Sequence, residues 1–266
     1  MVAIIYLVAG MSSRFSGNVK QMVKVGPNDE SLIQYSVDQA LKSPFNKILF
    51  ITNSQTEHLF KNIFGNMYNN VPIYYLEQKY DKNFRTRPWG TTDALCTALD
   101  IIDEPFILVN GDDIYGEETF KKGFEFMNTS TKNIIGCVKM NKSLPDNDLD
   151  VNRGVVFVDD INVTNMKEML KINRNKNPEL LNELANVNFI GLQVNVLEKL
   201  NNILIEFKNN HKDNPSIECL LPDCLNSLIL QKAMILEYFE ITNEIIGVTY
   251  PGDEIIVREI LAKIRK

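Results

Sequence analysis

Short apolar runs alternate with longer amphipathic segments through the first half of the chain. The runs have the length of strands, and the first two, which are rich in β-branched residues, read as strands that are buried on both faces. They occupy residues 2–8, 47–52, 72–76 and 105–109. Segments with apolar side chains near helical spacing lie between them, at residues 31–43, 55–64 and 91–102. Strands that alternate with helices in this way favour right-handed βαβ crossovers in a mainly parallel sheet.

The second half has a different pattern, in which strand-like segments follow one another with less helix between them. The expected strands occupy residues 133–140, 154–158, 186–196 and 233–239, and the expected helices occupy residues 196–207, 217–230 and 253–264. Residues 141–152 read as a polar loop, and the Asn- and Lys-rich residues 173–183 as an exposed one. Residues 1–266 contain no internal repeat, so we do not expect a β-helical domain among them.

Composition narrows the classes of function. The 266 residues are 44% hydrophobic and 23% charged, as in ordinary globular proteins. A net charge of −6 argues against bulk nucleic-acid binding. No apolar run approaches the roughly 18 residues that a membrane span needs, and the chain starts on a strand without a basic segment. We therefore expect a cytoplasmic protein with no membrane or nucleic-acid partner.

The four cysteines form no Cys-x-x-Cys pair and the chain has only two histidines, so a structural zinc site is not expected. Buried free thiols are the expected role for most of these cysteines. Any bound metal would need hard carboxylate oxygens, which points to Mg²⁺.

The loop after the first strand has the chemistry of a phosphate site. Small residues at positions 9–13 let backbone N–H groups approach a ligand closely, and Arg14 and Lys20 add positive charge to the same loop. An ordinary βα turn with two surface cations is the alternative. Gly10, Gln78 and Asp112 each follow a predicted strand, and ligands of parallel sheets bind beyond the carboxyl ends of the strands. All three should therefore lie at one edge.

The string Leu-Val-Ala-Gly-Met-Ser-Ser-Arg-Phe, with Lys20 after it, resembles the signature of nucleoside-diphosphate-sugar pyrophosphorylases. Val8 stands where the family has Ala, and Ser12 where it has a second Gly. The resemblance implies an α/β fold with a Rossmann-like, mostly parallel twisted sheet flanked by helices, and a smaller β-rich sugar-binding subregion. It also implies one nucleotidyltransferase domain over residues 1–266, with a nucleotide-binding half at 1–130 and a sugar-binding half with the C-terminal helices at 131–266.

The same resemblance implies roles for individual residues. Those implied in catalysis are Arg14, Lys20 and Asp112, and Asp112 is also the implied Mg²⁺ ligand. Those implied at the nucleotide are Ala9, Gly10, Met11, Ser12, Ser13, Gln78, Gly90 and Thr91. Gln78 corresponds to a base-reading amide, which can pair with the edge of a pyrimidine. Those implied at the sugar are Asp113, Gly154, Glu168 and Asn188. Gly247 stands where many members of the family have a second metal-binding aspartate.

The reaction implied is NTP + sugar 1-phosphate → NDP-sugar + pyrophosphate, with UTP as the first choice of nucleotide and glucose 1-phosphate or N-acetylglucosamine 1-phosphate as acceptor. A phosphocholine-type cytidylyltransferase that uses CTP is an alternative. A non-catalytic nucleotide-binding regulator is a second one, which the glycine at position 247 would explain. Four points stay open: the sugar, the choice among UTP, CTP and dTTP, the second metal ligand, and whether the protein forms a homo-oligomer.

Overall fold

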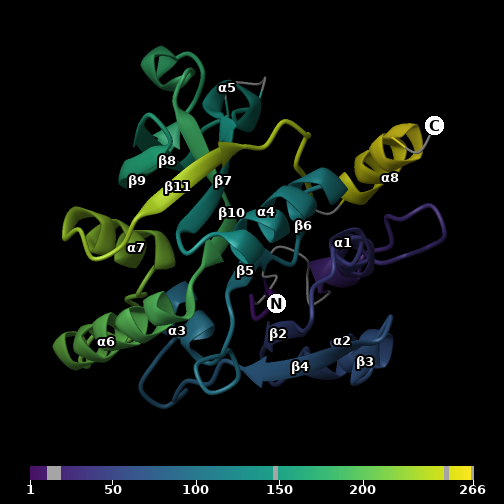
Figure 1. The fold of residues 1–266 in the computed structure, drawn as a ribbon, viewed down its shortest axis with the longest axis horizontal. Coiled ribbons are helices and arrows are strands. Elements are labelled where there is room, and N and C mark those ends of the chain that lie inside the picture. Colours follow the sequence, from purple (N-terminus) through teal and green to yellow (C-terminus); the bar gives the residue numbers. More distant parts are fainter. Residues whose placement is uncertain (11–18, 146–148, 249–251, 265–266) are drawn as a thin grey trace.

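The computed structural model describes residues 1–10, 19–145, 149–248 and 252–264 (Figure 1). Its main sheet has the strand order β3-β4-β2-β1-β5-β10-β7-β11-β9-β8. In Figure 1, β3 and β4 lie at one end of this sheet, at the lower right, and β8 and β9 lie at the other, at the upper left. No helix of the described residues is long and apolar enough to cross a membrane.

The first half of the chain forms the parallel part of the sheet. Its strands are β1 (Ala3–Leu7), β2 (Ile48–Thr52), β4 (Val71–Glu77) and β5 (Phe106–Asn110). β1 pairs in parallel with β2 on one side and β5 on the other, and β2 pairs in parallel with β4. All five residues of β2 are buried, because helices cover both faces of the sheet.

Alternate side chains of β1 enter two different cores, as the period of two in a strand requires. Ile4 and Tyr6 pack under α1 (Leu32–Ala40), α2 (Glu57–Phe64) and α4 (Glu117–Thr129). On the other face, Ala3 and Ile5 pack against α3 (Thr91–Cys96), α6 (Val194–Asn210) and α7 (Leu221–Leu230).

The second half makes the sheet mixed, so the expected mostly parallel sheet is not confirmed. β10 (Leu184–Leu192) pairs antiparallel with β5, with β7 (Asn133–Lys139) and with β8 (Val151–Asp159). β8 forms an antiparallel hairpin with β9 (Asn162–Ile172). β11 (Leu236–Glu240) pairs in parallel with β7 and antiparallel with β9.

Smaller elements complete the fold. They are β3 (Met67–Tyr68), the short helices η2 (Lys20–Met22), α5 (Met140–Ser143) and η3 (Pro178–Leu180), and a separate two-stranded sheet of β6 (Asp113–Ile114) and β12 (Ile246–Gly247). The C-terminal helix α8 (Asp253–Ile264) packs Val257 and Leu261 against Ile114 and Ile246 of this small sheet. Three of the four cysteines are buried, and none of the four is in a disulfide.

Two of the longer elements, α4 and β9, were not expected from the pattern. Gly123 interrupts the helical signal of α4, since glycine is a poor helix former. The structure explains the glycine, because a Cβ at position 123 would lie 2.6 Å from the ring of Phe189. β9 carries Lys and Glu among its exposed positions and lies at the hairpin end of the sheet, so it lacks a buried apolar run.

The two helix boundaries that differ most from expectation belong to α7 and α3. α7 begins at Leu221 rather than at 217, since the backbone of Cys219 bonds to Trp89 and Thr92 instead. α3 ends at Cys96, and turns rather than helix follow it.

Candidate active site

The carboxyl ends of four parallel strands meet at one edge of the sheet, as expected. Ala9 and Gly10 follow β1, Gln78 follows β4, and Asp112 follows β5. Asn53, after β2, donates its Nδ2 to the carbonyl of Ala9 at 2.9 Å and so ties two of these ends together. A Cβ built on Gly10 meets no described atom within 4 Å, which leaves its backbone open to a ligand. Met11, Ser12, Ser13 and Arg14 lie outside the described residues.

Two residues predicted for catalysis lie in direct contact. Lys20, the first residue of η2, donates from Nζ to Oδ2 of Asp112 in an ion pair. Their side chains are 25% and 23% exposed. The fold therefore brings the cation that ends the small-residue loop to the carboxylate at the end of β5, 92 residues further along the chain.

Asp113 lies half-buried beside this ion pair and is held by the strand that precedes it. Asn110 donates Nδ2 to Oδ2 of Asp113 at 2.9 Å. Burial, together with the charge of Asp112, raises the pKa of Asp113 to about 7. Gly247 pairs with Asp113 across β6 and β12, and a Cβ at position 247 would lie 2.6 Å from Oδ1 of Asp113. The carboxyl group of Asp113 thus fills the space that a side chain at 247 would need.

We expect Gly247→Ala to lower the free energy of unfolding by roughly 1–3 kcal/mol, the usual cost of overpacking a filled site. Gly10→Ala is the matched control, because its Cβ meets no described atom. Urea denaturation of both variants measures the difference. Equal stabilities would contradict the packing of Asp113 against Gly247.

The residues predicted for the nucleobase form a second group, at the end of β4. Gln78 donates its backbone N–H to the carbonyl of Thr52 at 2.9 Å, and its side chain donates to the carbonyl of Gly90 at 2.9 Å. Gly90 has φ of +100°, and a Cβ there would lie 2.7 Å from the carbonyl oxygen of Cys219. Only glycine fits both conditions. The hydroxyl of Thr91 accepts the backbone N–H of Leu221 at 2.9 Å.

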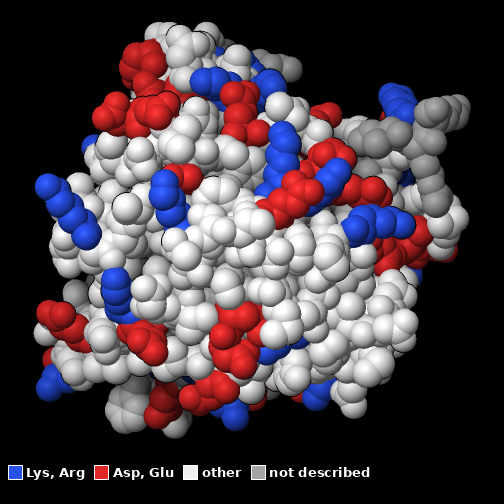
Figure 2. All heavy atoms as spheres, viewed as in Figure 1, with Lys and Arg blue, Asp and Glu red and all other residues white. Residues whose placement is uncertain are grey.

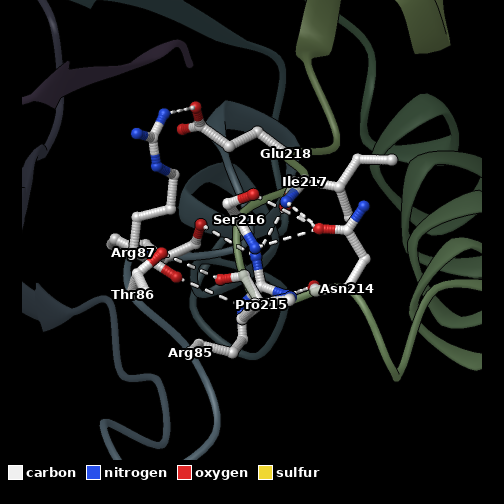
Figure 3. Close-up of polar contacts among 9 residues, drawn as sticks. Arg85, Thr86, Arg87, Asn214, Pro215, Ser216, Ile217 and Glu218 are labelled. Carbon is white, nitrogen blue, oxygen red and sulfur yellow. Dashed lines mark hydrogen bonds and ion pairs between the residues drawn. The ribbon is translucent and has the colours of Figure 1, made fainter.

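A network of polar contacts fixes the loop that carries Gly90 (Figure 3). The guanidinium of Arg85 donates to the carbonyls of Asn214, at 2.9 Å, and Ile217, at 2.5 Å, and it stacks 3.4 Å from the ring centroid of Trp89. Beside it, Thr86 donates its N–H to the carbonyl of Pro215 at 3.0 Å. These contacts fasten the loop between β4 and α3 to the segment that precedes α7.

A cavity of about 1010 Å³ lies beyond Asp113. All four residues predicted for the sugar line it, namely Asp113, Gly154, Glu168 and Asn188. Of the described residues predicted for the nucleotide, only Thr91 does. Residues that sequence reasoning did not identify also line it, including the amides Asn110, Asn152, Asn186 and Asn243. Asn152 lies in a segment that reads as a polar loop, so no local signal distinguished it.

The hairpin and a bulge in β10 place the sugar-side residues. Gly154 of β8 lies opposite Glu168 of β9, and burial raises the pKa of Glu168. Asn188 has φ of +57° and lies where the register of β10 against β7 shifts. Asn186 stabilises this conformation, since its Oδ1 accepts the N–H of Asn188 at 2.8 Å and its Nδ2 donates to Oδ1 of Asn188 at 3.1 Å. The bulge thus re-aims a side chain within an otherwise regular strand.

Two arginines at the far end of the cavity support its wall. Arg153 donates to the carbonyl and hydroxyl of Ser143, and Arg174 donates to the carbonyls of Asn141, Leu144 and Pro145. These contacts hold the segment around α5 in place. On the face shown in Figure 2, basic and acidic side chains are interspersed over the described surface and do not gather in one basic stripe.

Comparison with known proteins places this geometry in a family. The family model described as nucleotidyl transferase matches residues 5–184. No relative was found among curated protein sequences. The structure is similar to that of a putative glucose-1-phosphate thymidylyltransferase from Bacillus anthracis, with a TM-score of 0.72, 16% identity, and coverage of 98% of this chain and 95% of that chain.

Two further solved structures share the fold. One is the inositol-1-phosphate CTP transferase from T. maritima, with a TM-score of 0.69, 15% identity, and coverage of 99% of this chain and 96% of that one. The other is a UDP-glucose pyrophosphorylase complexed with UDP-glucose, with a TM-score of 0.68, 19% identity, and coverage of 99% of both chains. These likenesses confirm the expected α/β fold.

Proposed function

The chain belongs to the nucleotidyl transferase family, and on that premise we propose that it transfers a nucleotidyl group from an NTP, UTP first, to a sugar 1-phosphate. Glucose 1-phosphate and N-acetylglucosamine 1-phosphate are the acceptors we favour. A phosphate oxygen of the acceptor attacks the α-phosphorus of the nucleotide, the bond from that phosphorus to the bridging oxygen breaks, and pyrophosphate leaves. Two anions must approach each other, so catalysis depends on positioning and on neutralising charge.

The observation that carries this proposal is the contact of Lys20 with Asp112 at the strand-end edge, next to the large polar cavity. Lys20 would neutralise phosphate charge, and Arg14 would act with it. The backbone of residues 9–13 would approach the phosphates, and Gln78, Gly90 and Thr91 would hold the base. Asp113, Gly154, Glu168 and Asn188 would contact the sugar.

The lining of the cavity favours a polyhydroxylated acceptor over choline. Amide side chains can donate hydrogen bonds to hydroxyl groups and accept them, and carboxylates can accept them from several hydroxyl groups. A quaternary ammonium is recognised by aromatic rings, and no aromatic residue lines the described part of this cavity. We therefore place the sugar phosphate ahead of phosphocholine.

We further propose Mg²⁺ as the cofactor, held by Asp112. No group of three or more His, Cys, Asp or Glu side chains among the described residues could hold a metal ion on its own. A partly exposed carboxylate at a strand end nevertheless suits Mg²⁺, which often binds through one or two carboxylates plus substrate phosphates. The bound ion would stabilise charge on the phosphates.

A grid of nucleotides against acceptors tests the reaction. We expect pyrophosphate release with UTP or dTTP and a sugar 1-phosphate, and little with ATP or GTP, because a site built around Gln78 and the Gly90 backbone reads a pyrimidine. CTP with phosphocholine is the matched arm for the alternative enzyme. Preference for a purine nucleotide would refute the base site, and nucleotide binding without turnover on any acceptor would favour a non-catalytic regulator.

A further inference from the structure

A buried polar cluster surrounds the side chain of Gln78. Its Nε2 donates to the carbonyl of Gly90 at 2.9 Å and to Oδ2 of Asp93 at 2.8 Å. Lys208, on α6, donates from Nζ to the other carboxylate oxygen, Oδ1. Gln78 and Asp93 are each only 7% exposed. No role was predicted for Asp93 or Lys208 from the sequence, although both lie beside Gln78, which was predicted to bind the base.

The chemistry of these neighbours permits one orientation of the Gln78 amide. An amide has two N–H donors on its nitrogen and only acceptor capacity on its oxygen. The two groups that face this end of Gln78 are a carbonyl and a carboxylate, both acceptors. Both N–H groups are therefore used inside the protein. No described residue donates a hydrogen bond to Oε1, which leaves that oxygen as the group available to a ligand.

From this the geometry points to Asp93 as a specificity-determining residue: together with Lys208 it fixes Gln78 so that only an acceptor faces the nucleobase. The inference rests on the proposed function, in which Gln78 reads the base. Asp93 is a positioning residue in this scheme and touches no substrate.

An acceptor at this place selects for a base with a ring N–H. Uracil and thymine carry a hydrogen on N3. N3 of cytosine carries a lone pair and no hydrogen, and this lone pair would face the oxygen of Gln78. Two buried acceptors that face each other are both left without a hydrogen bond. The free-energy cost of this is larger than the net contribution of one ordinary hydrogen bond. The site should therefore bind UTP or dTTP roughly tenfold or more tightly than CTP.

Asp93→Asn is the sharpest test, because Lys208 decides how the new amide lies. The ammonium of Lys208 keeps an oxygen at the position of Oδ1, so the nitrogen of the new amide takes the place of Oδ2. A donor then faces one donor of Gln78 while the carbonyl of Gly90 still faces the other, so no single orientation of the Gln78 amide satisfies both neighbours, and its oxygen is no longer fixed toward the base. The preference for UTP over CTP should fall by about tenfold or more.

Removing the ammonium should reverse that loss. In the double variant Asp93→Asn/Lys208→Met the new amide is free to present its oxygen to Gln78 again, and most of the UTP preference should return. Asp38→Asn is the matched control, since it makes the same change at a half-buried aspartate that accepts the hydroxyl of Tyr68. Its selectivity should equal that of the wild type.

Calorimetric titration with UTP and CTP, in Mg²⁺ and without acceptor, measures binding independently of turnover. A third nucleotide, the triphosphate of 2-pyrimidinone riboside, has a lone pair on N3 and no exocyclic amine, so the wild type should bind it roughly tenfold more weakly than UTP. This arm needs no variant and stands if Asp93→Asn fails to fold.

The outcomes separate the two proposals. Equal binding of UTP and the 2-pyrimidinone nucleotide by the wild type, unchanged selectivity in Asp93→Asn, or a double variant no better than the single one would each overturn the role of Asp93. The nucleotidyltransferase proposal would then still stand on pyrophosphate release. No nucleotide binding at all by the wild type would overturn both.

Discussion

Lys20→Ala is expected to lower turnover by about 100-fold or more, the scale of loss seen when one preorganised charge contact to a developing anion is removed. Its ammonium already lies at the strand-end edge, against Asp112, before any phosphate is present. When the nucleotide binds, the ammonium has only to move from the carboxylate of Asp112 to the neighbouring phosphates.

The same substitution should leave the free energy of unfolding within about 1 kcal/mol of the wild type, because a partly exposed ion pair contributes little to stability. Steady-state pyrophosphate release and thermal melting measure the two effects separately. Lys24→Ala is the control, since Lys24 is exposed and follows four residues later on the same segment. A folded Lys20→Ala protein that turns over normally would refute the assignment.

The parts of the fold that could be predicted are those with a local signal. Short apolar runs identified β1, β2, β4 and β5, and their order with helices indicated the parallel half. The direction of the later strands has no such signal. β10 reads as a strand from its own residues, but only its neighbours β5 and β7 make it antiparallel. The mixed sheet was therefore not predictable from the pattern.

The candidate site divides in the same way. Asp112 and Gln78 lie at strand ends, where topology alone brings ligand-binding groups together, and Lys20 belongs to the segment that follows β1. The ion pair of Asp93 with Lys208, which orders Gln78, could not be found this way, because its two residues are 115 positions apart in the sequence. The pairing of Gly247 with Asp113 depends on two strands of two residues each, which are too short for any periodicity.

The ion pair of Lys20 with Asp112 also bears on when the metal arrives. In the protein alone, the ammonium competes with Mg²⁺ for the carboxylate, and Gly247 supplies no second one. Mg²⁺ also gives up its water reluctantly. We therefore expect the apo protein to bind Mg²⁺ weakly, and expect the ion to bind together with the nucleotide, whose phosphates supply further oxygen ligands and draw Lys20 away from Asp112.

Asp112→Asn should accordingly reduce turnover by about 100-fold or more, since the protein loses its one assigned ligand for the ion that stabilises charge on the phosphates. Asp103→Asn is the matched control, because Asp103 also pairs with a lysine, Lys47, but precedes β5 at the opposite end of that strand. Asp103→Asn should retain full activity.

Calorimetric titration with Mg²⁺, with and without UTP, measures the order of binding. If the apo protein binds Mg²⁺ as tightly as the nucleotide complex does, a second protein carboxylate must hold the ion, and Asp113, adjacent in the chain, is the first to substitute.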